Sequence, residues 1–273
     1  MPVADNPIRP LQRSLQSVLR RMTDPRLCAP FLLLAAFKAL MLVGAVRFDL
    51  LPAHIMAAIL WMFPQGVEVL HYPETLNNLP ELSRWFDRLV FVSVGAILHG
   101  WAIVYLARLW TNAPLVLFPN LVTGLRRVAS LACIAAMVLA IPYGTQFVAQ
   151  QLDNSIATAV ALTTGFLVQM FLFVAPAFLV VEGRSLLQSL RLSLSVVAEF
   201  PVAMPLVIVV LASMHAPILA LRTPGLMNGV GQDPDWILYI LLGQIPIDLL
   251  AAVLAAGLAS RLALTYRSRR QSA

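Results

Sequence analysis

Charged residues are scarce in this sequence. Only 12% of its 273 residues are Asp, Glu, Lys or Arg, whereas an ordinary soluble domain carries about 25%. Hydrophobic residues make up 60% of the chain, and its mean hydropathy is +0.82. A soluble fold of this size would leave far too much apolar surface in contact with water. The composition therefore excludes an ordinary soluble domain and predicts that lipid surrounds most of the chain.

Recognisable catalytic chemistry is also lacking. The sequence has no G-x-S-x-G, H-E-x-x-H, Walker A or G-x-G-x-x-G motif, and its two cysteines supply neither a disulfide framework nor a metal cluster. Glu68 and His71 lie three residues apart and His54 is a candidate third ligand, but an exposed loop pair is the favoured interpretation. We therefore expect no cofactor and no metal, and nothing in the sequence supports an enzyme.

The main feature of the sequence is a series of six long apolar runs. A membrane span needs about 20 mostly apolar residues to cross a hydrocarbon core about 30 Å thick. The runs occupy residues 30–46, 89–106, 128–148, 156–181, 201–221 and 236–260. A seventh run, 50–63, is too short to span, and we leave open whether it is re-entrant or interfacial. The sequence thus predicts an all-α, polytopic membrane protein with six transmembrane helices.

Basic residues predict the orientation of these spans. With the N-terminus inside, fourteen arginines lie on the cytoplasmic side and four on the other side, namely Arg47, Arg84, Arg88 and Arg222. This bias follows the positive-inside rule, so both termini are expected in the cytoplasm. The same rule accounts for the net charge of +6 and the pI near 10.0. The charge therefore does not indicate a nucleic-acid partner.

Three regions are expected along the chain. Residues 1–28 form a cytoplasmic amphipathic helix, residues 29–264 form the transmembrane domain with an external segment at 47–88, and residues 265–273 form a basic cytoplasmic tail. The N-terminal helix has a basic polar face suited to the lipid surface, and Pro25 and Pro30 are expected to break it before the first span.

A second amphipathic segment, 183–200, is predicted between the fourth and fifth spans. It forms a cytoplasmic elbow, for which Glu182, Arg184 and Arg191 are candidate partner-docking residues. Its expected apolar face consists of Leu186, Leu187, Leu190, Leu194 and Val197. Two interpretations stay open: the elbow docks a cytoplasmic partner such as an ATPase, or it only satisfies the membrane boundary.

Four polar residues fall near the middle of predicted spans. They are Lys38, His99, Gln169 and Asp248. Charges at the bilayer centre are costly, so they normally face the interior of a helix bundle and form pairs. We therefore predict a contact between Lys38 and Asp248, with His99 and Gln169 in the same layer. The layer is either a structural pairing that fixes helix packing, which is favoured, or a substrate or proton site.

Short motifs in the second half of the chain resemble a known family. PAFLVVEG (176–183), SLRLS (189–193) and LTYR (264–267) are similar to the membrane-domain family named after glycerophosphoryl diester phosphodiesterases and to related bacterial integral membrane proteins. The resemblance covers about residues 120–270. It implies a six-helix membrane module without catalytic residues, because this chain has no room for the phosphodiesterase barrel. The same segment is less similar to the permease subunits of ABC importers. Their cytoplasmic loop carries Glu-Ala-Ala with a glycine a few residues later, whereas here Glu182 is followed directly by Gly183.

The leading hypothesis is therefore a non-enzymatic protein of the bacterial inner (plasma) membrane, acting as a scaffold or as a subunit of an envelope assembly. The alternative is a transporter or permease component that uses the polar layer, and a third is an intramembrane enzyme. The lipid bilayer is the expected partner, together with either other membrane subunits or a cytoplasmic protein.

Overall fold

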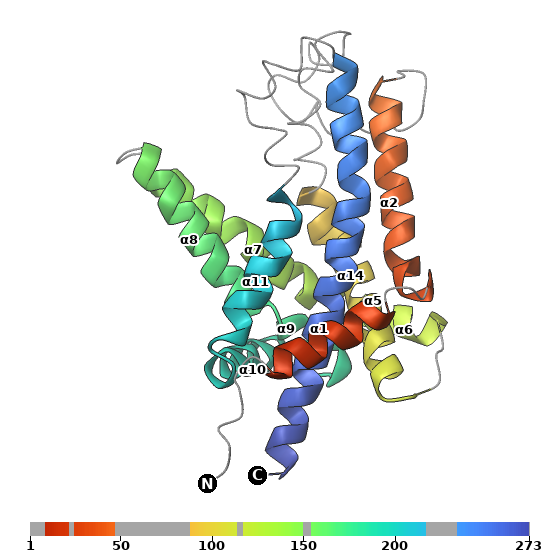
Figure 1. Ribbon diagram of the computed structural model, residues 1–273, viewed down its shortest axis with the longest axis vertical. Helices are drawn as coiled ribbons and strands as arrows, with labels where there is room; N and C mark the ends of the chain where they lie inside the picture. The colour runs from red at the N-terminus through yellow and green to blue at the C-terminus, as the bar shows by residue number, and fades with distance from the viewer. Residues whose placement is uncertain are drawn as a thin grey trace. The chain divides into compact units, whose positions relative to one another are not determined.

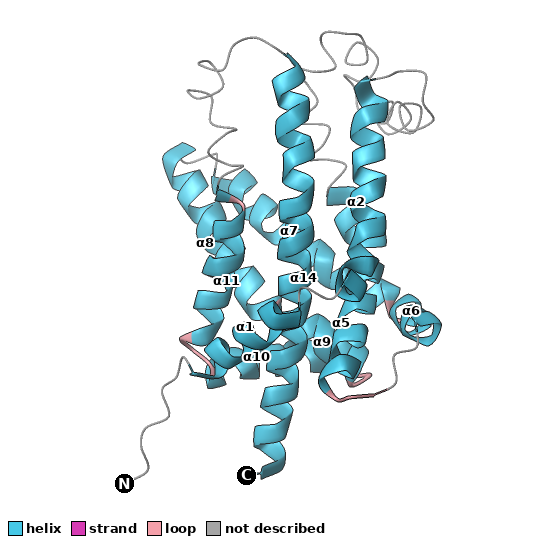
Figure 2. Ribbon diagram, turned by 45° about the vertical axis from the view of Figure 1, so that its right-hand side comes forward, coloured by secondary structure: helices cyan, strands magenta, loops and turns pink. Residues whose placement is uncertain are grey.

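The computed structural model describes residues 9–21, 25–46, 88–113, 117–149, 154–216 and 234–272 (Figure 1). Every regular element in these ranges is helical, and none is a strand (Figure 2). The elements are α1 (Arg9–Arg21), α2 (Pro25–Val46), the π-helical turn η2 (Phe91–Gly95), α5 (Ala96–Trp110), α6 (Leu117–Arg126), α7 (Val128–Ala149), α8 (Asn154–Leu172), α9 (Ala175–Val181), α10 (Leu186–Glu199), α11 (Ala203–Met214) and α14 (Pro234–Ser272). The predicted all-α class is confirmed for this part of the chain.

Four helical stretches are long and apolar enough to cross a membrane. They contain 22 to 33 residues each, and they are Arg88–Trp110, Val128–Ala149, Ala159–Val181 and Tyr239–Gln271. A fifth crossing exists if α10 and α11, which are bent by 102° relative to each other, form one broken span. Length and composition thus give four or five membrane-crossing helices in the described residues.

Two of the six predicted runs are not among these stretches. The run 30–46 lies in α2, whose apolar stretch Phe31–Leu40 is shorter than a span. The run 201–221 corresponds to α11 and to residues beyond 216, which lie outside the described part. The short run 50–63, the candidate ligands near it and the external segment up to residue 87 also lie outside it. Six spans therefore stay a prediction.

Prolines interrupt the helices less than the sequence suggests. The break expected at Pro30 is wrong, because α2 begins at Pro25 and continues through Pro30. Pro142 lies inside α7 and Pro246 inside α14 without ending either helix. Each proline removes one backbone N–H, and the remaining hydrogen bonds of a long apolar helix are enough to continue it where no water competes for them.

The described chain separates into two compact units. The first unit contains Met1–Pro30, Val90–Ala212 and Ala252–Ala273, and the second contains Phe31–Leu89 and Ser213–Ala251. The first unit therefore holds α1 and the helices from α5 to α10. The second unit holds most of α2 and the first part of α14. Each unit is considered separately below.

The core of the first unit is formed by α5 and α9. Residues 102–107 of α5 and 175–180 of α9 are buried at every position. Ile103, Leu106 and Phe178 are among the largest side chains that are completely covered. A helix that is apolar and buried on all sides belongs at the centre of a bundle. Helix α7, which forms a hairpin with α8, packs against both α5 and α9.

The C-terminal helix is longer than a bilayer requires. Its 39 residues correspond to about 58 Å of helix, against about 30 Å of hydrocarbon. Residues 265–272, which were expected as a basic tail, continue the helix without a break. Its C-terminal half is held on α5, since Trp110 Nε1 donates to Ser260 Oγ at 3.2 Å and the Arg261 guanidinium lies 5.4 Å from the centre of the Trp110 ring.

The N-terminal helix α1 packs on protein with part of its apolar face. Val18 is only 1% exposed, and a Cβ placed at Gly257 of α14 would lie 2.8 Å from its Cγ1 atom. Leu19 is exposed. Val18 therefore packs on α14, because the glycine leaves room for this side chain against the helix backbone.

Candidate functional site

The second unit contains the predicted contact between Lys38 and Asp248. Lys38 Nζ, from α2, donates to Asp248 Oδ2, from α14, at 2.6 Å. The Lys38 side chain is 10% exposed and the Asp248 side chain 29% exposed. Opposite charges at this distance stabilise each other strongly when little water is present. The contact joins two helices through residues that are 210 positions apart in the sequence.

Two further side chains complete the surroundings of the Asp248 carboxylate. His215 Nε2 lies 3.2 Å from Oδ1, and Gln244 Nε2 donates to Oδ1 at 3.3 Å and to Oδ2 at 3.1 Å. Both carboxylate oxygens thus have polar partners. We call Lys38, His215, Gln244 and Asp248 the polar cluster. Chemically, it can hold helices together or carry a proton between a carboxylate and an imidazole.

Sequence reasoning missed two members of this cluster. Gln244 precedes Asp248 by four residues, and this spacing places both side chains on one helix face, so the pair was detectable. His215 comes from a different segment and has no spacing relation to Asp248. Only the fold brings this histidine to the carboxylate.

The other two residues of the predicted polar layer belong to the first unit. His99 lies in α5 and is partly exposed, and Gln169 lies in α8 with an exposed side chain. The structure therefore supplies the Lys38–Asp248 contact, while a shared layer that includes His99 and Gln169 stays a prediction.

The predicted elbow is present in the first unit. After α9 ends, Gly183 adopts a backbone φ of +66°, and its carbonyl accepts a hydrogen bond from Arg127 Nη2 at 2.9 Å. Arg184 Nε then lies 3.2 Å from Glu182 Oε2. Ser185 begins α10 with a capping box to Gln188, so that the turn and the next helix are both defined locally.

Replacing Gly183 with alanine is expected to destabilise the elbow. A left-handed φ costs an L-residue with a Cβ about 1–2 kcal/mol, so we expect Gly183→Ala to lower the thermal unfolding temperature of the purified protein. Gly144→Ala is the matched control, because Gly144 is helical with no atom within 4 Å of the added Cβ. Equal melting temperatures for the two variants would contradict the turn geometry.

The face of α10 that packs on the chain consists mainly of small residues. Ser189, Ser193 and Val196 are buried, whereas Leu187 and Leu194 of the predicted apolar face are exposed. Ser193 Oγ donates to Phe171 O at 2.6 Å and so attaches α10 to the end of α8. Small residues allow close helix packing, and leucines can face lipid instead.

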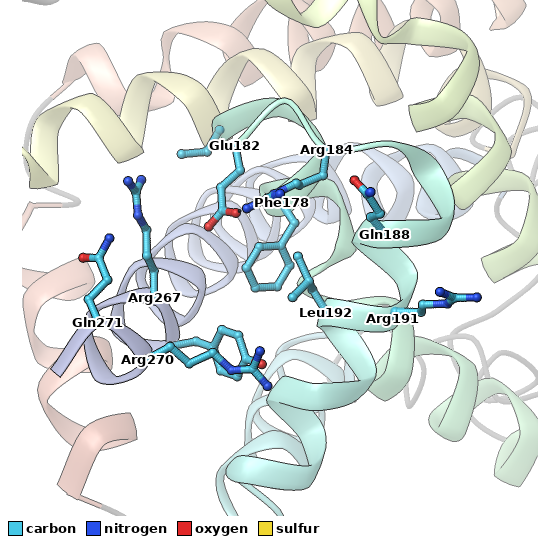
Figure 3. A pocket seen from close by; sticks show the side chains of 11 residues that line it. Phe178, Glu182, Arg184, Gln188, Arg191, Leu192, Arg267, Arg270 and Gln271 are labelled. Carbon is cyan, nitrogen blue, oxygen red and sulfur yellow. Dashed lines mark hydrogen bonds and ion pairs between the residues drawn. The ribbon is translucent and has the colours of Figure 1, made fainter. Parts of the chain in front are cut away.

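A cavity of about 690 Å³ lies beside the elbow. All three predicted docking residues, Glu182, Arg184 and Arg191, line it. Figure 3 shows Arg267, Arg270 and Gln271 on one side, residues of the elbow and α10 on the other, and Phe178 between them. Sequence reasoning missed the contribution from α14 because residues 265–273 were regarded as a separate tail.

No metal centre is formed by the described residues, among which no group of three or more His, Cys, Asp or Glu side chains could hold an ion. Comparisons of the chain with protein-family models, with curated proteins and with solved structures give no match. The features that bear on its function are therefore the helices, the polar cluster and the cavity.

Proposed function

We propose that this chain is a non-enzymatic integral membrane protein of the bacterial inner membrane that serves as a scaffold or as a subunit of an envelope assembly. In this proposal six spans cross the bilayer, and the amphipathic helices and both termini lie in the cytoplasm. The four or five apolar helices support a membrane location, and the distribution of arginines supports the orientation. The motifs at 176–193 and 264–267 support kinship with the membrane module of the phosphodiesterase-associated family.

The hairpin of α7 and α8 carries the scaffold proposal. Only 17% of the apolar window in Val128–Ala149 is buried within the chain, whereas the corresponding share for Arg88–Trp110 is 50%. Large apolar side chains protrude from both helices, with Phe147 69% exposed and Leu162 70% exposed. A helix pair so weakly covered by its own chain offers a long surface to helices of another subunit.

Photo-crosslinking in native membranes tests this proposal. A photoreactive amino acid at Phe147 or Leu162 is expected to give a discrete adduct with a defined membrane protein. The matched control is the same amino acid at Ile103, which is 0% exposed and should link only within the chain. Adducts with lipid alone at both hairpin positions would contradict the scaffold function.

A second candidate function rests on a specific observation in the other unit. The carboxylate of Asp248 contacts a titratable imidazole, His215, within an apolar helical environment. Ionisable groups in such a position often mark ion or proton pathways. A transporter or permease component is therefore the alternative proposal, and proton flux separates it from the first, as described in the Discussion.

A further inference from the structure

The cavity beside the elbow is lined by basic groups, most of which form no ion pair within the described part of the chain. Four arginines and one glutamate line it, which gives the wall a net charge of +3. The glutamate, Glu182, already pairs with Arg184. The other three, Arg191, Arg267 and Arg270, form no ion pair with any residue that the structure describes. The cavity thus has a surplus of hydrogen-bond donors and positive charge.

The inner wall of this cavity contains an unsatisfied donor. Phe178 is 1% exposed and Tyr266 3% exposed, and their rings meet edge to face at 5.9 Å. The Arg270 guanidinium lies 5.0 Å from the centre of the Tyr266 ring. The Tyr266 hydroxyl is buried, yet it has no hydrogen-bond partner in the described part of the chain. A buried hydroxyl without a partner is costly, so Tyr266, which lines the cavity, would be stabilised by an acceptor that a ligand brings to it.

Membrane topology alone does not explain this arrangement. The positive-inside rule accounts for arginines at a cytoplasmic boundary, but exposed arginines satisfy that rule anywhere on the surface. It gives no reason for a buried hydroxyl beside them. The N-terminal end of α10, at Ser185 and Gln188, adds further partial positive charge on the same side. These features together are suited to an anion.

We propose that the cavity binds a phosphate-bearing ligand, with Arg267 and Arg270 contacting its charged oxygens and the Tyr266 hydroxyl donating to one of them. The planar guanidinium group matches phosphate oxygens in pairs. A volume of about 690 Å³ lies within the usual range for small-molecule sites. The phosphate belongs either to a phospholipid headgroup or to a soluble phosphate ester. No lining residue comes from the α7–α8 hairpin, so the proposal does not depend on the scaffold function.

Two binding measurements on the purified full chain distinguish these sources. Glycerol 3-phosphate and inorganic phosphate are titrated against the protein in neutral detergent, with thermophoresis as the readout. Short-chain phosphatidylglycerol and phosphatidylcholine are compared by native mass spectrometry. We expect saturable binding of at least one phosphate probe that weakens as salt is added, and a preference for phosphatidylglycerol if the source is a lipid.

Three variants test the assigned residues. Tyr266→Phe keeps the ring and removes only the hydroxyl, and we expect about three- to tenfold weaker binding. Arg267→Gln/Arg270→Gln is expected to weaken binding more than tenfold. Arg126→Gln, an exposed arginine on α6 outside the cavity, removes one positive charge and should leave binding unchanged. If the double variant does not fold, Tyr266→Phe still decides the matter.

The outcomes separate clearly. Binding of the soluble phosphates alone identifies an ester site, and selective retention of phosphatidylglycerol identifies a headgroup site. The proposal is overturned if neither class binds saturably, if Tyr266→Phe binds as tightly as the wild type, or if Arg126→Gln weakens binding as much as the double variant.

Discussion

Replacing either Lys38 or Asp248 alone is expected to destabilise the folded protein by about 3–5 kcal/mol, because each single change removes the charged partner of a largely buried ion. Replacing both with apolar residues is expected to cost less than either single change. The variants are Lys38→Met, Asp248→Leu and the combination of the two. Thermal unfolding in detergent and the monodisperse yield from size-exclusion chromatography measure the losses, and a double-mutant cycle gives the coupling energy.

The control for this cycle is Gln169→Leu. Gln169 is also a polar residue inside an apolar helix, but its side chain is exposed, so its loss should change stability by less than about 0.5 kcal/mol. If the two single losses simply add in the double variant, the 2.6 Å contact contributes nothing and the structural interpretation of the pair is wrong.

The same pair separates the two candidate functions. Asp248→Asn keeps the shape of the side chain and removes its charge, so proteoliposomes that contain a pH-sensitive dye can test proton flux under an imposed membrane potential. A flux in the wild type that is lost in Asp248→Asn and in His215→Gln would favour the transporter. The scaffold proposal expects no flux in the wild type.

Replacing Gly257 with leucine is expected to displace α1 from α14 at a cost of about 1–3 kcal/mol, as for other overpacked sites. Even the first added atom would lie 2.8 Å from Val18 Cγ1, and a valine side chain is too short to move aside. A cysteine at position 14 is the reporter, because Ser14 is 3% exposed. In a background without native cysteines, we expect its labelling by a water-soluble maleimide to become much faster.

A second-site change and a matched control make this test specific. Val18→Ala should restore slow labelling in the Gly257→Leu protein, since it removes the atoms that collide. Gly243→Leu, in the same helix but with no atom within 4 Å of the added Cβ, should leave labelling slow. If Gly257→Leu labels no faster than Gly243→Leu, the packing of α1 described above is wrong.

Composition and charge were enough to predict the helical class and one long-range contact. The cost of isolated charges in lipid points to a pairing of Lys38 with Asp248 even without coordinates. The sequence also predicts the elbow helix. The amphipathic segment predicted at 183–200 contains α10 (Leu186–Glu199), and the predicted bounds differ from the observed ones by only a few residues.

Features that depend on which surfaces meet could not be predicted in this way. Periodicity identifies an amphipathic helix but not the partner of each face, so the buried serines of α10 and the contact of Val18 with Gly257 were missed. The same limit applies to His215 and Tyr266, which reach their sites from distant segments. The sequence also did not predict that α14 lines the cavity beside the elbow, because the basic end of α14 is helical and was expected to be a free tail.

The two faces of α10 also affect how its sequence can change over time. On the proposed membrane surface, exposed leucines such as Leu187 would contact fluid acyl chains that adapt to almost any apolar shape, so isoleucine, valine or phenylalanine should be accepted there. Ser189 and Ser193 lie in a packed interface where an added methylene has no room. Among natural variants, the leucine positions should therefore keep apolar residues of varying size. The serine positions should keep small residues.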